Sequence, residues 1–369
     1  MNTTQRTLPG LALLGLIACG TEPQRVTATL QADRFAGSEW SEPVNLGPVI
    51  NSSAVDANAG LSSDAHTLFF VSTRAGGLGN LDIWMSHRQC LSCDWEAPVN
   101  LGAPINSDAI DAAPTMSDDG RLLFFYSARS GGFGLGDVYV SHRVSTDADG
   151  DVWGPPVNLG AVINTSGREA APHISRDGHR LYFGSGRPGA SGTTDIWVSW
   201  RSDPNDDFAW EAPVNLGPQV NSPGFEGGVT LRLPELYVAS DRADPGPDHP
   251  LHIYLSVIGP DGAFGRAVLV PELSSEGNDL RPTIRFDGRE LFLSSNRAGS
   301  AGGSQDIWVS TRRAFGAPWT TPINLGAPVN TEFNEVQPSL SADGRILLFA
   351  SDRPGGSGGV DLYMATRAR

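Results

Sequence analysis

The sequence predicts an all-β protein, a six-bladed β-propeller of four-stranded blades, and three observations support this prediction. The chain holds 44 Gly and 27 Pro, many short apolar runs, and no long stretch with helical apolar spacing. A phrase of the form Trp-x-x-Pro-Val-Asn-Leu-Gly recurs along it. Its asparagines, Asn45, Asn100, Asn158, Asn215 and Asn324, lie 55, 58, 57 and 109 residues apart, the last gap spanning one degenerate copy. A period near 55 residues suits a propeller blade.

The N-terminal segment differs from the repeats and predicts export. Arg6 precedes the apolar run 11–17, which is too short to span a bilayer and is typical of a secretory signal. The ending Leu16-Ile17-Ala18-Cys19 resembles the lipobox of bacterial lipoproteins, which implies a lipidated Cys19. The alternative is an ordinary signal peptide that contains a cysteine by chance.

These features divide the chain into three parts. We expect a lipoprotein-type signal peptide over 1–18, a lipidated tether over 19–38 and the propeller over 39–369. Residue 20 is not Asp, and by resemblance to the lipoprotein sorting rule this favours the outer membrane, facing the periplasm.

Cys90 and Cys93 remain as a pair once Cys19 carries lipid. Export to an oxidising compartment favours a local disulfide between them. Two free thiols remain an alternative, whereas redox chemistry lacks its βαβ context and a structural zinc site lacks ligands.

The formal charge of −15 excludes nucleic acid and anionic lipid surfaces as favoured partners. We therefore expect a monomeric propeller that touches the membrane through its lipid anchor alone. Cations and basic surfaces remain compatible with this charge.

The second repeat serves as the template for a blade, and its four strands are predicted at about 112–116, 122–127, 137–142 and 152–159. The second strand is almost wholly apolar and should lie inside the blade. Asp119-Gly120 forms the turn before it, because Gly accepts a positive φ and Asp bonds to the backbone. A glycine-rich loop joins the second and third strands.

The phase of the repeats predicts how the ring closes. The chain enters on a fourth-strand phrase at Trp40 and ends on a third-strand phrase at Asp361. Residues 39–46 should therefore pair with the strand near 360–367 and complete the last blade, which removes exposed edges.

The recurring Ser-x-Asp-Gly, apolar strand, Ser-Asp-Arg, glycine loop and Asp-Ile-Trp resemble the WD40-like, TolB-type propeller repeat (PD40) over about 40–369. The resemblance implies the fold, but the family includes binding proteins, peptidase propellers and sugar-processing enzymes. Repeat four departs from the pattern: it lacks the Asp-Gly turn near Leu233, has His252 in place of Asp, and has Leu269 in place of Asn.

Each second strand ends in an arginine, and in five repeats an aspartate follows across the glycine loop. We expect charge-assisted pairs that fix the hairpin. These structural pairs are Arg74 with Asp82, Arg129 with Asp137, Arg187 with Asp195, Arg297 with Asp306, and Arg353 with Asp361, while Arg242 faces His252.

One carboxylate precedes each first strand, which is innermost in a propeller. The set is Asp56, Asp111, Glu169, Glu226, Asp279 and Glu335. One interpretation is a binding ring at the channel mouth that gathers Ca²⁺, Mg²⁺ or basic groups. The other is that each carboxylate caps a turn or pairs with a neighbouring blade. Asparagines five residues earlier, such as Asn106, should bond to the backbone.

No catalytic motif stands out, because the chain has no Gly-x-Ser-x-Gly elbow, no His-Glu-x-x-His and no phosphate-binding glycine loop. We expect a lipid-anchored, periplasm-facing module that binds an envelope protein or glycan. The alternative is an enzyme that processes a carbohydrate or small molecule with a metal at the acidic channel mouth.

Overall fold

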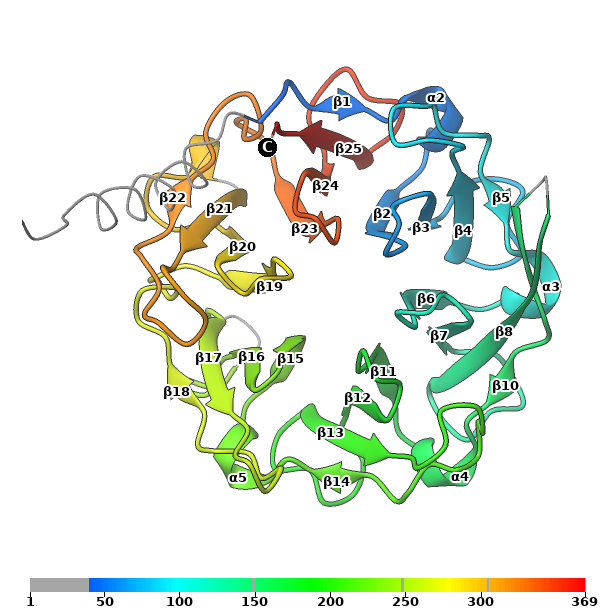
Figure 1. Ribbon diagram of the computed structural model, residues 1–369, viewed down its shortest axis with the longest axis vertical. Coiled ribbons are helices and arrows are strands. Elements are labelled where there is room, and N and C mark those ends of the chain that lie inside the picture. Colours follow the sequence, from blue (N-terminus) through cyan, green and yellow to red (C-terminus); the bar gives the residue numbers. More distant parts are fainter. Residues whose placement is uncertain (1–39, 148–149, 247–248, 304, 369) are drawn as a thin grey trace, which may run out of the picture.

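The computed structural model describes residues 40–147, 150–246, 249–303 and 305–368, and it forms a ring of six antiparallel sheets around a central axis (Figure 1). The predicted signal peptide, Cys19 and the tether lie outside the described residues. The all-β, six-bladed architecture predicted from the repeat period is confirmed.

Four strands follow one another from the axis outward in each blade. The innermost strands are β2 (Asp56–Leu61), β6 (Asp111–Met116), β11 (Glu169–Ile174), β15 (Glu226–Arg232), β19 (Asp279–Ile284) and β23 (Glu335–Leu340). The second strands are β3 (Thr67–Ser72), β7 (Leu122–Ser127), β12 (Arg180–Ser185), β16 (Glu235–Ser240), β20 (Glu290–Ser295) and β24 (Ile346–Ser351). The third strands are β4 (Asp82–His87), β8 (Asp137–Asp147), β13 (Asp195–Trp200), β17 (His252–Val257), β21 (Asp306–Thr311) and β25 (Asp361–Thr366). The outer strands are β5 (Val99–Asn100), β10 (Val157–Asn158), β14 (Val214–Asn215), β18 (Val268–Leu269), β22 (Ile323–Asn324) and β1 (Val44–Asn45).

We number the blades one to six from the innermost strand β2 to the innermost strand β23. Short helical turns lead from one blade to the next or lie in loops: α2 (Gly47–Ile50), α3 (Gly102–Ile105), α4 (Gly160–Ile163), α5 (Gly217–Val220) and η1 (Ala301–Gly303). No helix in the described parts of the chain is both long enough and apolar enough to cross a bilayer.

The core lies between neighbouring blades, because the second strands bury both of their faces. Along β7, Phe124 packs in the cluster shared with blade three, whereas Phe125 packs in the cluster shared with blade one. Every residue of β7 is buried, as its apolar sequence predicts. Each blade is therefore held by its two neighbours, and the ring supplies the burial that a lone four-stranded sheet lacks.

Strand β1 closes the ring by pairing antiparallel with β25, as the phase of the repeats predicted. Val44 lies opposite Met364 and Asn45 opposite Tyr363. Trp40, just before the strand, packs edge-to-face on Phe292 of blade five, with ring centroids 6.0 Å apart. The first and last of the described strands are thus joined in blade six.

The outer strands are shorter than predicted. The template strand expected over 152–159 is reduced to Val157–Asn158, and β8 instead extends to Asp147 and pairs with β9 (Gly150–Trp153). Pro156 stands immediately before Val157, and proline has no N–H to donate to a ladder, which ends regular pairing there.

Candidate functional site

The six carboxylates of the predicted ring all lie at the first position of an innermost strand, and each is fully buried, with no exposed area. Asp111 is representative. It accepts hydrogen bonds from the backbone N–H of Ser107 at 2.6 Å and its hydroxyl at 2.7 Å, and it pairs with Arg129 Nη2 at 2.8 Å. A buried carboxylate requires such partners, and it finds them inside its own blade. These contacts fit the second interpretation of the sequence, in which each carboxylate caps a turn.

Within the described residues, no three His, Cys, Asp or Glu side chains are grouped so that they could hold a metal ion. The six carboxylates on which the metal-assisted enzyme alternative depends are buried. Cation binding by the protein stays a prediction.

The arginines that end the second strands pair with these carboxylates and not with the third-strand aspartates, so the predicted hairpin pairs are wrong. The ion pairs are Arg74–Asp56, Arg129–Asp111, Arg187–Glu169, Arg242–Glu226, Arg297–Asp279 and Arg353–Glu335. The register explains this, because Asp56 lies opposite Ser72, and Arg74 turns back from that strand end. Its Nε donates to the Ser72 hydroxyl at 2.9 Å.

The third-strand aspartates instead hold the glycine loop and the outer strand. Asp82 accepts from the backbone N–H of Gly79 at 3.0 Å and from Asn100 Nδ2 at 2.9 Å. Asn106 donates to Asn100 Oδ1 at 2.9 Å and bonds both ways with the backbone of Ile83. We call this aspartate and its two asparagines the polar lock. Counterparts of Asn106 bond to the backbone in the same way, as predicted.

Blade four has lost all three members of the polar lock. His252 replaces the aspartate, Leu269 replaces the outer-strand asparagine, and Ser274 replaces the linker asparagine. The Ser274 hydroxyl still bonds with the backbone of Ile253, at 3.1 and 3.3 Å. The buried Nδ1 of His252 has no hydrogen-bond partner and lies 3.8 Å from Asp279 Oδ2.

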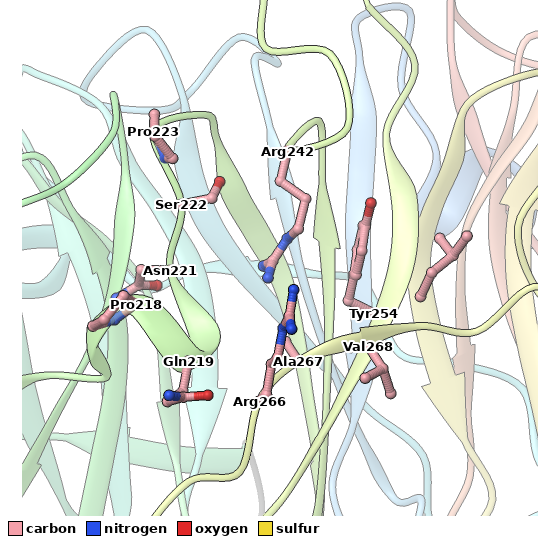
Figure 2. A pocket seen from close by; sticks show the side chains of 11 residues that line it. Pro218, Gln219, Asn221, Ser222, Pro223, Arg242, Tyr254, Arg266, Ala267 and Val268 are labelled. Atoms are coloured by element: carbon pink, nitrogen blue, oxygen red, sulfur yellow. The ribbon is translucent and has the colours of Figure 1, made fainter.

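A pocket of about 460 Å³ opens beside blade four, next to this altered lock. Its wall comes from α5 and the residues after it, from Arg242 and Tyr254, and from the segment 266–269 around β18. Figure 2 shows the guanidinium ends of Arg242 and Arg266 pointing toward one another, with Tyr254 alongside. Leu269 lines the pocket where an asparagine would otherwise bond to the third strand.

The pocket is locally basic. Arg242 lies 3.4 Å from Glu226 Oε1, the longest of the six repeated pairs, and its guanidinium stacks 4.3 Å from the Tyr254 ring centroid. Burial lowers the pKa of Arg242 and raises the pKa of Glu226 despite hydrogen bonds from Ser222 and Ser240 to that carboxyl. Arg266 is exposed and has no carboxylate partner within the described residues. The pocket thus contains two arginines, and Glu226 is the carboxylate that pairs with one of them, Arg242.

A second repeated feature, which sequence reasoning missed, lies at the other end of the blades. An arginine directly after the third strand stacks on the tryptophan of the outer phrase, as in Arg201 over Trp210 at 4.4 Å. Its Nε donates to a turn carbonyl, Gly178 O, at 2.8 Å. The same clamp recurs as Arg88–Trp95, Arg312–Trp319 and Arg367–Trp40. The signal was visible as an arginine six residues after each third-strand aspartate.

Blade four lacks this clamp as well, because Ile258 and Phe264 take the places of arginine and tryptophan, and Leu233-Pro234 replaces the Asp-Gly turn. A second pocket, of about 500 Å³, is lined by all four of these residues together with residues of blade three. Tyr182 is one of them, and its buried hydroxyl has no hydrogen-bond partner. Burial raises its pKa to about 12. Both pockets therefore coincide with places where blade four departs from the repeat.

The predicted disulfide between Cys90 and Cys93 is present and staples the loop between β4 and β5. It lies in blade one and contributes no residue to either pocket.

Comparisons with known proteins support the fold. No protein-family model matches the sequence, and no curated protein matches it. Among solved structures, a putative TolB from Agrobacterium tumefaciens is similar with a TM-score of 0.52 and 14% identity, over 89% of this chain and 97% of that one. A protein of unknown function from Dyadobacter fermentans is similar with a TM-score of 0.55 and 14% identity, over 90% and 100%.

TolB from Acinetobacter baumannii matches with a TM-score of 0.52 and 16% identity over 82% of this chain, but over 64% of its own length, so this chain spans less than two thirds of that protein. At such identities the likeness concerns the fold. The chain is a six-bladed β-propeller whose fold is similar to that of the TolB structures.

Proposed function

We propose that the protein is a binding module of the cell envelope whose blade-four pocket receives an anionic group, a carboxylate or phosphate, of an envelope protein or glycan. The observation that supports this proposal is the convergence of Arg242 and Arg266 on one pocket, with Arg266 lacking a carboxylate partner among the described residues. Arginine presents a fork of donors that matches the oxygens of such groups.

The composition of the pocket favours binding over chemistry. Pro218, Val268 and Leu269 supply apolar wall, and Gln219 and the Tyr254 hydroxyl add uncharged polar groups beside the arginines. An apolar wall with a few convergent polar groups is the usual form of a ligand site. The local positive charge is notable because the chain as a whole carries −15.

The proposed localisation in the cell envelope rests on the lipobox-like segment that ends at Cys19. Mature protein anchored through lipid on Cys19 would carry the propeller on the tether, facing the periplasm. Expression in a Gram-negative host tests this: the wild type should fractionate with outer membranes, and Cys19→Ala should not be lipidated and should leave that fraction. Equal fractionation of the two proteins would contradict the anchor.

The pocket is tested by calorimetric titration with inorganic phosphate and with acetate at low ionic strength. We expect Arg266→Gln to weaken binding about tenfold or more, because one charge-assisted hydrogen-bond partner is lost. Arg313→Gln is the matched control, since Arg313 is also an exposed arginine but lies outside the pocket. Equal losses in the two variants would mean that overall charge, and not the pocket, governs binding.

A second variant restores the repeat. His252→Asp combined with Leu269→Asn should rebuild the aspartate–asparagine bond that the other blades contain and fill part of the pocket. We expect this variant to fold at least as stably as the wild type and to bind the anions more weakly. Unchanged affinity in a folded variant would place the binding elsewhere.

A further inference from the structure

The innermost strands surround the axis (Figure 1), and none of their third and fifth residues is buried; we call these twelve residues the wall of the axis. The sixth residues, Leu61 and its equivalents, pack into the clusters between blades, and the first residues are the buried carboxylates. The third residues are Asn58, Ala113, Ala171, Gly228, Arg281 and Gln337, and the fifth are Gly60, Thr115, His173, Thr230, Thr283 and Ser339. None of them belongs to a core cluster, and Ala171, Gly228 and Arg281 are exposed to solvent. None of the twelve carries a carboxylate.

Each innermost strand contains a β-bulge at its third residue. One residue is inserted between the paired positions, as between Ala57 and Gly60. The third residue is left-handed in all six blades, with φ of 49° at Arg281 and 59° at Gln337, for example. Non-glycine residues adopt this conformation rarely, and such strain gathers at functional sites. The bulge lets the Asn58 N–H donate to Gln337 Oε1 of the adjacent blade at 2.7 Å.

Arg281 supplies the one full positive charge among these twelve residues. Its Nη1 donates to Asn58 Oδ1 at 2.8 Å, a bond that reaches from blade five past blade six to blade one. No carboxylate pairs with it within the described residues. Its side chain is solvent-accessible, yet the surrounding protein lowers its pKa. The bond between Arg281 of blade five and Asn58 of blade one places this guanidinium beside the axis.

The remaining polar groups of the wall are neutral. The hydroxyls of Thr115 and Thr283 donate to the carbonyl oxygens of Pro172 and Pro338 in the next blades, at 2.9 and 2.8 Å. Burial lowers the pKa of His173, so this imidazole is uncharged at neutral pH. A negative ligand therefore meets the charge of Arg281 with no competing carboxylate on the wall.

Two arginines also lie at the hairpin-turn end of the axis. Arg176 of blade three and Arg232 of blade four both stack on the exposed ring of Phe286 in blade five, at 4.6 and 4.2 Å. Asp118 pairs with Arg176 at 3.0 Å on the surface, while Arg232 has no ion pair in the described residues. Burial and the charge of Arg176 lower the pKa of Arg232, although Asp287 opposes this.

We infer that the central channel is an oxyanion site, separate from the blade-four pocket, in which Arg281 binds the carboxylate or phosphate of a small ligand that enters past Arg176 and Arg232. The site contrasts with the net charge of the chain. Asn58 holds the guanidinium of Arg281 by one bond, which leaves its other N–H groups for the ligand.

The test is calorimetric titration with citrate and with inorganic phosphate at low ionic strength, using the wild type, Arg281→Gln, Arg281→Lys and Arg266→Gln. We expect Arg281→Gln to weaken citrate or phosphate binding about tenfold or more, and Arg281→Lys to weaken it less because its charge remains. Arg266→Gln should leave binding at Arg281 unchanged. The wild type should therefore show two binding events, one removed by Arg281→Gln and the other by Arg266→Gln.

Three results would overturn the channel site: no binding of either probe beyond the event that Arg266→Gln removes, equal affinity in wild type and Arg281→Gln, or equal weakening in Arg281→Gln and Arg313→Gln. Thermal unfolding of each variant verifies that the ring is intact. If binding that depends on Arg281 is observed and binding that depends on Arg266 is not, the channel site is supported and the blade-four pocket is contradicted. If only binding that depends on Arg266 is observed, the blade-four pocket is supported and the channel site is contradicted.

Discussion

Arg312 and Glu235 form a two-point ion pair across the boundary between blades five and four, with Nη1–Oε1 and Nη2–Oε2 distances of 2.8 and 2.7 Å. Each residue is 3% exposed. The Tyr237 hydroxyl joins them, because it donates to Glu235 Oε2 at 3.1 Å and accepts from Trp319 Nε1 at 2.9 Å. Blade four, which lacks both the polar lock and the arginine clamp, is thus tied to blade five by a buried polar network.

Breaking this ion pair should destabilise the ring strongly. In Glu235→Gln the buried guanidinium of Arg312 loses its counter-charge, and we expect the free energy of unfolding to fall by about 3–5 kcal/mol. Urea unfolding followed by tryptophan fluorescence measures the change. Arg121→Gln is the comparison, because its pair with Asp119 is exposed and should be worth about 1 kcal/mol or less. Similar losses of unfolding free energy in both variants would contradict a stabilising role for the buried Arg312–Glu235 pair.

The turn aspartates should shape the acid limit of stability. Burial raises the pKa of Asp119, but hydrogen bonds from Ser117 and Arg121 outweigh it and lower the pKa from 3.8 to about 2. A depressed folded-state pKa contributes stability above the unfolded value that is lost as the pH falls through the folded value. Asp119→Asn should therefore flatten the dependence of Tm on pH between about 4 and 2. An unchanged acid slope in the variant would exclude this contribution.

Ring closure should depend on Trp40 more than on the apolar residue of β1 itself. Trp40 packs on Phe292 and stacks 4.6 Å from the Arg367 guanidinium, so Trp40→Ala should cost about 3–5 kcal/mol of unfolding free energy. Val44→Ala provides the control, because the Val44 side chain is 58% exposed. Equal small losses from both substitutions would mean that closure rests on the β1–β25 backbone pairing alone.

Divalent cations should add little to stability. Ca²⁺ takes six to eight oxygen ligands, whereas the first-strand carboxylates are buried and engaged within their blades. We expect millimolar Ca²⁺ or Mg²⁺ to shift Tm no more than NaCl of the same ionic strength. A cation-specific rise in Tm that Asp111→Asn abolishes would restore the acidic ring as a cation site.

The blade count and the closure of the ring could be predicted from sequence, because both depend on the period and phase of residues such as Trp40 and Asp361. The ion pairs could not. Arg74 lies eight residues before Asp82 and eighteen after Asp56, so proximity along the chain favoured the wrong partner. The bulge between Ala57 and Gly60 shifts the pairing of β2 with β3, and a sequence pattern does not reveal such an insertion.

The pockets were predictable in part. The departures of blade four at His252 and Leu269 were visible in the sequence, and the structure places one pocket beside Leu269. The effect of these two substitutions could not be predicted, because the sequence did not show the polar lock that the other blades form. The surroundings of the first-strand carboxylates could not be predicted for a related reason: the sequence allowed either a channel mouth or a turn cap, and they are buried and paired with arginines inside their blades.

The pairing of β1 with β25 has a consequence for synthesis. Asn45 donates to Asp361, 316 residues further along the chain, at 2.9 Å. Because synthesis begins at the N-terminus, β1 has no partner until β25 has been made. Blades one to five can assemble earlier, but the arc they form has an open sheet at each end, which invites proteolysis and aggregation. A product that stops before β25 therefore leaves the ring open at blade six.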